Sequence, residues 1–383
     1  MLGRPRLAAV RHAVAILATA LLLGAPVAVL AAPPRVGLVT GAAMARDPGR
    51  VLTDAKAAGA GWTREDFPWY RVQPAPGVWD WRASDQLMIA AAHRDLRVLA
   101  LLTGAPCWAV RRGTPSDACS RTLPARDGPF ARFAARVAKR YAPGGSFWRA
   151  HRRLDGSLAP RWFELWNEPY LPPPHARSGA TPERYARMVR AAVRAGRAAA
   201  PGTRWLSAAT ADVRDTGPGA AGGWISWARG MVRGVPDIGS DIDALAVHPY
   251  PAGRPPGYRP TSGTDPSFHA TELVAQQFAA AGVPAPVWIT EVGYSACEQA
   301  ISPAGWCVPG ASAADREQRK ADWLGELLAQ LDAPEYAGVG AVFVYALYEG
   351  GGTPLERRFG LMAPGGRRLP AWYAFQAAAR RSQ

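Results

Sequence analysis

Residues 162–169 read WFELWNEP, a short apolar run that stops at a glutamate followed by proline. A stretch with Ala and Arg at helical spacing follows at 181–200, and a second short apolar run follows at 203–209. Short apolar runs of this kind are typical of buried strands, and the longer amphipathic stretch is typical of a helix. A strand, a helix and a strand in this order indicate one unit of a parallel sheet.

The same alternation of a short apolar run and a longer amphipathic stretch occurs eight times along the chain. Eight units favour a closed (β/α)8 barrel, the TIM barrel of the α/β class, over an open doubly wound sheet. No low-complexity linker separates a second domain, so we predict one barrel domain over residues 33–383. The predicted strands are Arg35–Thr40, Gly61–Phe67, Arg97–Thr103, Arg161–Glu168, Thr203–Ala209, Ile242–His248, Pro286–Glu291 and Val339–Tyr345, and the clearest helices are Pro129–Tyr141, Thr181–Ala200, Phe268–Ala281 and Ala314–Leu331.

The first 32 residues have the composition of a secretory leader. Arg4, Arg6 and Arg11 precede an apolar run from Ala13 to about Leu23, and small residues follow near the end of the segment. A basic start, an apolar middle and small residues at a cleavage site are typical of a signal peptide. The alternative is that the apolar stretch remains as a membrane anchor, which would make the membrane a partner. We expect a secreted or periplasmic protein.

Four cysteines fall into two local couples, Cys107 with Cys119 and Cys297 with Cys307. Disulfides persist in the oxidising compartments that exported proteins reach. Pairing within each couple is favoured among the three possible connectivities. A metal site is the alternative, but the couples show no CxxC spacing and no nearby histidine. We therefore predict two disulfides and no metal ligands.

The composition is that of an ordinary globular protein, with 48% hydrophobic and 20% charged residues, which excludes disordered and fibrous classes. The chain of 383 residues carries 45 basic and 30 acidic side chains, a net charge of +15 at pH 7. A bias in base composition accounts for this excess of Arg, and an anionic polymer or surface as partner is the functional alternative. Since no basic cluster or nucleic-acid motif is present, nucleic acid is not expected as a partner.

Two of the predicted strands end in a glutamate. Glu168 closes the run quoted above, and Glu291 lies in the run VWITEV at 287–292. The connections after the strands, such as 170–180 and 251–266, are long and rich in Pro and Gly, and in barrels the C-terminal ends of the strands carry the chemistry. Two carboxylates across this mouth can approach to about 5 Å, the separation at which one attacks an anomeric carbon while the other protonates the leaving oxygen.

With these two motifs the sequence resembles the clan A glycoside hydrolases, and more closely the family 39 group and its bacterial exopolysaccharide-hydrolase relatives. The resemblance spans essentially the whole chain after the leader. In that clan the fourth strand ends in Asn-Glu-Pro, which occurs here at 167–169. The resemblance implies that Glu168 is the acid/base and that Glu291 is the nucleophile of a retaining enzyme.

The resemblance also implies roles for residues near the two glutamates. Arg64 resembles the second-strand arginine beside the nucleophile, where a fixed cation keeps a carboxylate ionised; a structural ion pair is the alternative. His248 and Tyr250 resemble the sixth-strand His and Tyr that bond to the nucleophile and the sugar; a core His followed by a turn Tyr is the alternative. Asn167 would hold the 2-hydroxyl of the sugar.

The end of the predicted eighth strand and Glu164 are two further positions near the barrel interior. Clan members usually place Trp at the end of the eighth strand as a sugar platform, whereas residues 342–348 here read VFVYALY. Tyr345 or Tyr348 could take the place of that platform and bind substrate. Glu164 has the same strand parity as Glu168, so we expect it to point into the barrel as a buried, paired structural carboxylate.

Together these features predict a retaining β-glycoside hydrolase that acts on an extracellular or periplasmic polysaccharide without a cofactor, more by endo than by exo action. If the polysaccharide is anionic, Arg254 and Arg259 in the loop after the sixth strand would bind it. One alternative is a catalytically inactive barrel that binds a glycan in a polysaccharide export assembly, although such a binder has no need of both glutamates. The other alternative is a transglycosidase with the same site.

Overall fold

The computed structural model describes residues 34–41, 47–170, 180–209, 224–260, 266–298 and 305–382. The predicted leader at 1–32 lies outside these residues, as does most of the loop predicted at 170–180. Within the described ranges, no helix is both long enough and apolar enough to cross a membrane.

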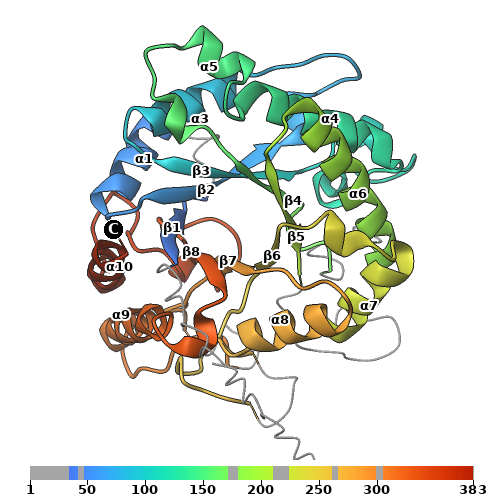
Figure 1. The fold of residues 1–383 in the computed structure, drawn as a ribbon. Coiled ribbons are helices and arrows are strands. Elements are labelled where there is room, and N and C mark those ends of the chain that lie inside the picture. The colour runs from blue at the N-terminus through green and yellow to red at the C-terminus, as the bar shows by residue number, and fades with distance from the viewer. Residues whose placement is uncertain are drawn as a thin grey trace, which may run out of the picture. The chain divides into compact units, whose positions relative to one another are not determined.

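Eight parallel strands pair in chain order and form a closed barrel, because β8 also pairs with β1. Figure 1 shows the helices arranged around this ring of strands. The predicted (β/α)8 barrel is confirmed. β3 and β8 have the predicted bounds, and the others differ by one or two residues at their ends, except β4. The strands are β1 Arg35–Val39, β2 Trp62–Pro68, β3 Arg97–Thr103, β4 Trp162–Leu165, β5 Arg204–Ala208, β6 Ala244–Val247, β7 Val287–Val292 and β8 Val339–Tyr345.

The four helices that the sequence predicts most clearly correspond to α4, α6, α8 and α9, each within two residues of its predicted bounds. Thr181 caps α6 by accepting a hydrogen bond from the Arg184 amide, and Ser312 forms a capping box with Asp315 at the start of α9. The helices are α1 Pro48–Ala57, α2 Trp69–Val72, α3 Arg82–Ala92, α4 Asp127–Tyr141, α5 Ser146–Ala150, α6 Pro182–Ala199, α7 Trp224–Gly234, α8 Ala270–Ala280, α9 Ala313–Gln330 and α10 Pro370–Arg381.

Aromatic side chains fill the barrel interior toward the N-terminal ends of the strands. The ring centroid of Trp288 lies 6.0 Å from that of Trp62 and 4.4 Å from that of Trp162, and Phe343 stacks on it at 6.4 Å. Gly37 makes room for this layer, since a Cβ at that position would lie 2.7 Å from the Phe343 ring. This end of the barrel is a packed core, so the polar groups that can do chemistry lie at the opposite end.

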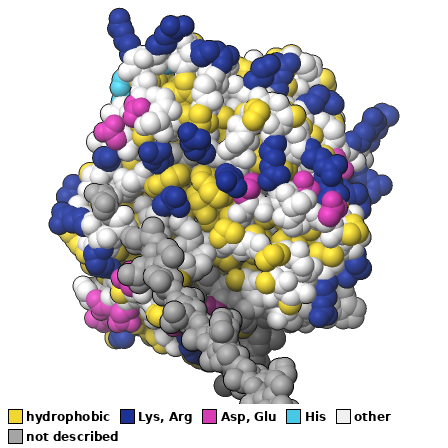
Figure 2. Space-filling view, viewed as in Figure 1, with side chains coloured by type: hydrophobic (Ala, Val, Ile, Leu, Met, Phe, Trp, Pro, Cys, Tyr) yellow, Lys and Arg dark blue, Asp and Glu magenta, His cyan; other side chains and the backbone are white. Residues whose placement is uncertain are grey.

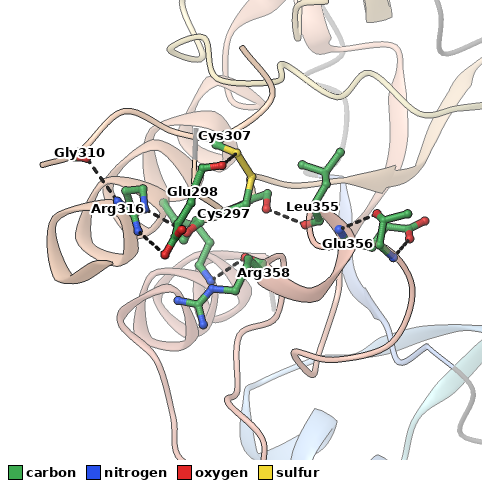
Figure 3. The surroundings of a disulfide bond; sticks show 12 residues. Cys297, Glu298, Cys307, Gly310, Arg316, Leu355, Glu356 and Arg358 are labelled. Carbon is green, nitrogen blue, oxygen red and sulfur yellow. Dashed lines mark hydrogen bonds and ion pairs between the residues drawn. A yellow bond between two sulfur atoms is a disulfide. The ribbon is translucent and has the colours of Figure 1, made fainter. Parts of the chain in front are cut away.

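Two disulfides lie in loops that follow strands. Cys107–Cys119 closes the loop after β3, and Cys297–Cys307 closes the loop after β7, so both predicted pairs are present. Figure 3 shows the second disulfide, with Arg316 of α9 directed at the same loop. The Ser295 hydroxyl donates a hydrogen bond of 2.7 Å to the Leu355 carbonyl, which ties this loop to the segment after β8. Two disulfides indicate an oxidising compartment.

Each disulfide is expected to stabilise the fold by roughly 2 to 3 kcal/mol, because it closes a short loop and restricts the unfolded chain. Double replacement of Cys107 and Cys119 by Ser, and separately of Cys297 and Cys307, should lower the free energy of unfolding by about this amount in denaturant titrations. Peptide mapping under non-reducing conditions tests the pairing itself. A cross-link between the two segments would contradict it.

Candidate active site

The chain turns out of β4 before it reaches Glu168. β4 ends at Leu165, so the prediction that the strand extends to Glu168 is wrong. Trp166 has a φ of 68° and Glu168 a φ of 42°, in the left-handed region that residues other than glycine rarely adopt. Trp166 is buried, with its ring centroid 5.7 Å from that of Phe130 in α4, and this packing holds the turn. Backbone strain of this kind clusters at functional sites.

Glu291 lies near the C-terminal end of β7, where the strand is irregular. Trp288 points into the barrel, and regular alternation would direct Thr290 inward and Glu291 outward. The register of β7 against β8 shifts between Ile289 and Val292, however, so both Thr290 and Glu291 reach polar groups at the mouth. An irregular strand therefore supplies two adjacent residues to one site.

Both oxygens of Glu291 accept a hydrogen bond. Oε1 accepts from Nη1 of Arg64 at 2.6 Å, and Oε2 accepts from the hydroxyl of Tyr250 at 2.7 Å. Burial opposes ionisation, but His248, Arg64 and Tyr250 outweigh it and hold the pKa of Glu291 below its ordinary value. The carboxylate is therefore ionised and fixed in orientation.

Arg64 of β2 joins acidic side chains of two other strands, Glu164 of β4 and Glu291 of β7. Its Nε and Nη2 atoms donate to the two oxygens of Glu164 at 2.6 and 2.9 Å, and Nη2 also donates to Oδ1 of Asn167 at 2.9 Å. Burial opposes the charge of Arg64, but Glu164 and Glu291 outweigh it and raise its pKa. Glu164 is fully buried and paired, as predicted. Arg64 is thus both a structural ion pair and a partner of Glu291.

Glu168 contacts the buried ring of His248. Nδ1 of His248 lies 2.8 Å from Oε1 of Glu168, and Nε2 lies 3.0 Å from the Thr290 hydroxyl. That hydroxyl donates its hydrogen to Glu164 at 3.2 Å, so its oxygen is left to accept a hydrogen bond from the N–H at Nε2. Burial favours the neutral ring, but Glu291 and Glu168 outweigh it and raise the pKa of His248. Glu168 and His248 together can therefore hold a mobile proton.

The two glutamates lie close together. One carboxylate oxygen of Glu168, one of Glu291 and a ring nitrogen of His248 all lie within 4.8 Å of one another. Retaining glycosidases have carboxyl groups about 5 to 5.5 Å apart, whereas inverting enzymes need about 6.5 to 9.5 Å to admit a water molecule. With their nearest oxygens no more than 4.8 Å apart, the two carboxyl groups are closer to the shorter separation than to the longer one.

The same three groups are the described residues that could converge on a metal ion, although the sequence predicts none. The positive guanidinium of Arg64 lies 2.6 Å from Glu291, where it would repel a cation. Tyr250 occupies the other oxygen of Glu291 as a donor. The donor set therefore fits proton transfer better than metal binding.

Tyr345 lies at the end of β8, beside the site. Its ring centroid is 6.3 Å from that of Tyr250, and Phe359 packs against both rings at 5.6 and 5.5 Å. Tyr348 instead donates its hydroxyl proton to Asp54 in α1 at 2.5 Å. Of the two tyrosines considered as a platform, Tyr345 is the one next to the glutamate pair, and its contact with a sugar stays a prediction.

Three further residues contact the site, and of these only Thr290 has no signal in the sequence. Thr290 bonds to His248, the Tyr170 hydroxyl lies 3.4 Å from Oε1 of Glu168, and the Trp306 ring centroid lies 6.4 Å from that of Tyr250. The sequence does signal Tyr170 and Trp306, as aromatic residues in loops after strands, where a ring face can stack on a sugar or pack in the fold. Thr290 carries none, since a regular strand would separate it from Glu291.

No family model matches the sequence, and no curated protein matches it. Solved structures do match. The chain is similar to a family 39 glycoside hydrolase from the gut symbiont Bacteroides cellulosilyticus WH2, with a TM-score of 0.62 and 20% identity over 91% of this chain and 64% of that one. It is similar to the GH39 enzyme from Xanthomonas axonopodis pv. citri, with a TM-score of 0.57 and 19% identity over 90% of this chain and 66% of that one.

A third similar structure is GH5_18 from Streptomyces cattleya in complex with GlcNAc, with a TM-score of 0.57 and 20% identity over 92% of this chain and 81% of that one. The chain spans less than two thirds of the length of the two family 39 structures. The structural neighbours are thus glycoside hydrolases, in agreement with the predicted resemblance to clan A, and at these identities the likeness establishes that this chain shares their fold.

Proposed function

We propose that this protein is a retaining β-glycoside hydrolase, with Glu291 as nucleophile and Glu168 as acid/base. The observation that carries the proposal is the close pair of carboxylates, in which donors hold both oxygens of Glu291 while Glu168 is bonded to a histidine. The glycoside hydrolases among the structural neighbours support the same class of chemistry. Double displacement by two carboxyl groups needs no cofactor.

In the first step the ionised Glu291 attacks the anomeric carbon while Glu168 gives its proton to the leaving oxygen. The bond from Glu291 to the sugar forms as the glycosidic bond breaks, and the departing sugar takes the proton. Arg64 and Tyr250 keep Glu291 charged and aimed. Asn167, whose Oδ1 accepts a hydrogen bond from Arg64, would bind the 2-hydroxyl of the reacting sugar.

In the second step water replaces Glu291 on the anomeric carbon. Glu168, now ionised, accepts a proton from that water, and the ester to Glu291 breaks. Two inversions give net retention. The hydrogen bond between His248 and Glu168 orients the Glu168 carboxyl group in both steps, and Thr290 in turn orients His248.

We propose a polysaccharide outside the cytoplasm as the substrate and endo cleavage as the mode of action. The two disulfides are consistent with an extracellular or periplasmic location. The connections after strands four to six are long enough in sequence to wall a groove that admits the middle of a chain.

The positive net charge does not by itself support an anionic polysaccharide. Figure 2 shows Lys and Arg side chains spread over the viewed face rather than gathered in one patch. Arg259 lies 3.3 Å from Glu335 and 3.7 Å from Glu272, so its charge is already paired within the fold. Arg254 stacks over the ring of Tyr258 at 4.6 Å.

A screen of the purified protein against a polysaccharide panel tests the proposal, with the host's own exopolysaccharide among the panel. NMR of the first products should show the anomeric configuration of the substrate, and an inverted product would contradict retention. Product length separates endo from exo action. Longer products with an added acceptor would favour the transglycosidase, and binding without any product would favour the glycan-binding alternative.

Replacing Tyr250 with Phe should move the acidic limb of the kcat/KM profile to higher pH. The Tyr250 hydroxyl helps to hold the pKa of Glu291 low, and activity is lost as pH falls through that pKa. Without the hydroxyl the pKa of Glu291 rises, so the loss begins at a higher pH. Since a hydrogen bond to a charged group contributes about 1.5 to 3 kcal/mol, kcat/KM at neutral pH should fall roughly 10- to 100-fold.

Replacement of Tyr373 with Phe is the matched control, because Tyr373 is exposed on α10. This variant should keep both the pH profile and kcat/KM of the wild type. An unchanged acidic limb in the Tyr250 variant would show that Glu291 does not govern it.

A further inference from the structure

Asp66 continues the inward face of β2 beyond Arg64. Trp62 packs inside the barrel, and Arg64, two residues later, reaches Glu164 and Glu291. Side chains along a strand alternate between its two faces, so Asp66 points the same way, one step closer to the mouth. The third inward residue of β2 is therefore a carboxylate at the level where the chemistry takes place.

The Asp66 side chain keeps access to solvent in a strand that is otherwise almost wholly buried. The surrounding protein and the charges of Glu291 and Glu164 raise the pKa of Asp66 above its ordinary value, and Arg64 opposes them. Within the described ranges it makes no hydrogen bond and no ion pair. The next residue, Glu65, faces the opposite way, is buried, and accepts a hydrogen bond from Thr40 at 2.7 Å. Asp66 thus offers free acceptor oxygens to whatever enters the mouth.

Asp66 lies on the side of the nucleophile. It interacts electrostatically with Arg64, Glu291 and Glu164, and it also acts on Tyr345 at the end of β8. The sugar ring that becomes bonded to Glu291 must lie against these residues, while the leaving sugar lies beyond Glu168. Asp66 is therefore placed to contact the reacting ring rather than the leaving group.

The charges of the site limit which substituents the reacting sugar ring can carry. The guanidinium of Arg64 is already shared between Glu164 and Glu291, and His248 is bonded to Glu168. A carboxylate on the reacting sugar would meet Asp66 and Glu291 as like charges, and among the described residues of the site no cation is left unpaired to offset them. A hydroxyl or an amino group would instead donate a charge-assisted hydrogen bond to Asp66.

We infer that Asp66 is a specificity residue that binds hydrogen-bond donors of the reacting sugar, and that this ring is a neutral or amino sugar and not a uronic acid. The inference rests on the proposed glycosidase function. It concerns only the ring held by Glu291, so acidic sugars elsewhere along the polysaccharide remain compatible with it.

The test uses the intact protein and 2,4-dinitrophenyl β-glycosides of glucose, mannose, galactose and 2-amino-2-deoxyglucose, each neutral hexoside compared with its uronide. The wild type should turn over its best neutral or amino glycoside roughly 100-fold or more faster than the uronide. Asp66→Ala and Asp66→Asn should lower kcat/KM on that glycoside about 10- to 100-fold, since a hydrogen bond to a charged acceptor is lost. Both variants should also reduce the ratio of kcat/KM on the hexoside to kcat/KM on the uronide. A purely structural defect would leave that ratio unchanged.

Asp322→Asn is the matched control, because Asp322 is an exposed carboxylate on α9. It should keep the wild-type ratio. A wild type that prefers a uronide overturns the inference, as does a ratio that neither Asp66 variant changes. If no glycoside is turned over and the polysaccharide panel releases no reducing ends, the glycosidase function itself fails, and the inference fails with it.

Discussion

Replacing Glu291 with Gln is expected to reduce turnover of every substrate by roughly 10⁴- to 10⁶-fold, the range seen when a central catalytic group is removed. The amide of Gln is a poor nucleophile and carries no charge to stabilise the developing positive charge on the sugar. Because Gln has nearly the same shape as Glu, and because Arg64 keeps its two hydrogen bonds to Glu164, the barrel should stay folded. Steady-state kinetics with a dinitrophenyl glycoside and a thermal melt measure the two effects separately.

The matched control is Glu326→Gln, since Glu326 is an exposed carboxylate on α9. It should keep full activity. Retained activity in the Glu291 variant, with an intact fold, would show that the nucleophile lies elsewhere and that the resemblance to clan A does not extend to the mechanism.

The barrel could be predicted from the sequence because its strands are buried on both faces. β3 reads RVLALLT and β8 reads VGAVFVY, and both are continuous apolar runs with the predicted bounds. The end of β4 could not be predicted in this way. Trp166 and Glu168 adopt positive φ values that nothing in the local sequence signals, and the turn depends on burial of Trp166 against a helix distant in the chain.

The residues of the site were predictable to different degrees. Some positions follow from the parity of one strand, whereas others depend on contacts between distant parts of the chain. Arg64 has inward strand parity, and it meets Glu291 as the resemblance implies. Thr290 could not be predicted, because the register shift in β7 is set by the pairing of two whole strands. Asp66 has no distinctive sequence signal, because a single carboxylate near a strand end is an ordinary feature, and only its lack of a hydrogen-bond partner among the described residues sets it apart.

Replacing Glu168 with Ala distinguishes acid/base catalysis from nucleophilic attack. Glu168→Ala should lower turnover of a polysaccharide by about 10²- to 10⁴-fold, because the leaving oxygen no longer receives a proton. A dinitrophenolate leaves without a proton, so with that substrate the sugar should still transfer to Glu291. The glycosyl-enzyme should then accumulate, because no base activates water for its hydrolysis. A burst of dinitrophenolate followed by slow turnover is the expected time course.

Azide decides the assignment, since it is a nucleophile that needs no base. Added azide should restore turnover of Glu168→Ala and give a glycosyl azide with the anomeric configuration of the substrate, because it attacks an intermediate already inverted once by Glu291. In Glu291→Ala, azide can act only by direct displacement in place of the missing carboxylate, so any azide product should be inverted. Opposite outcomes in the two variants would exchange the roles of the glutamates. The asymmetry of their contacts argues for the assignment made here: Arg64 and Tyr250 hold Glu291 in its charged form, whereas Glu168 is bonded to His248, a group that can both accept and return a proton.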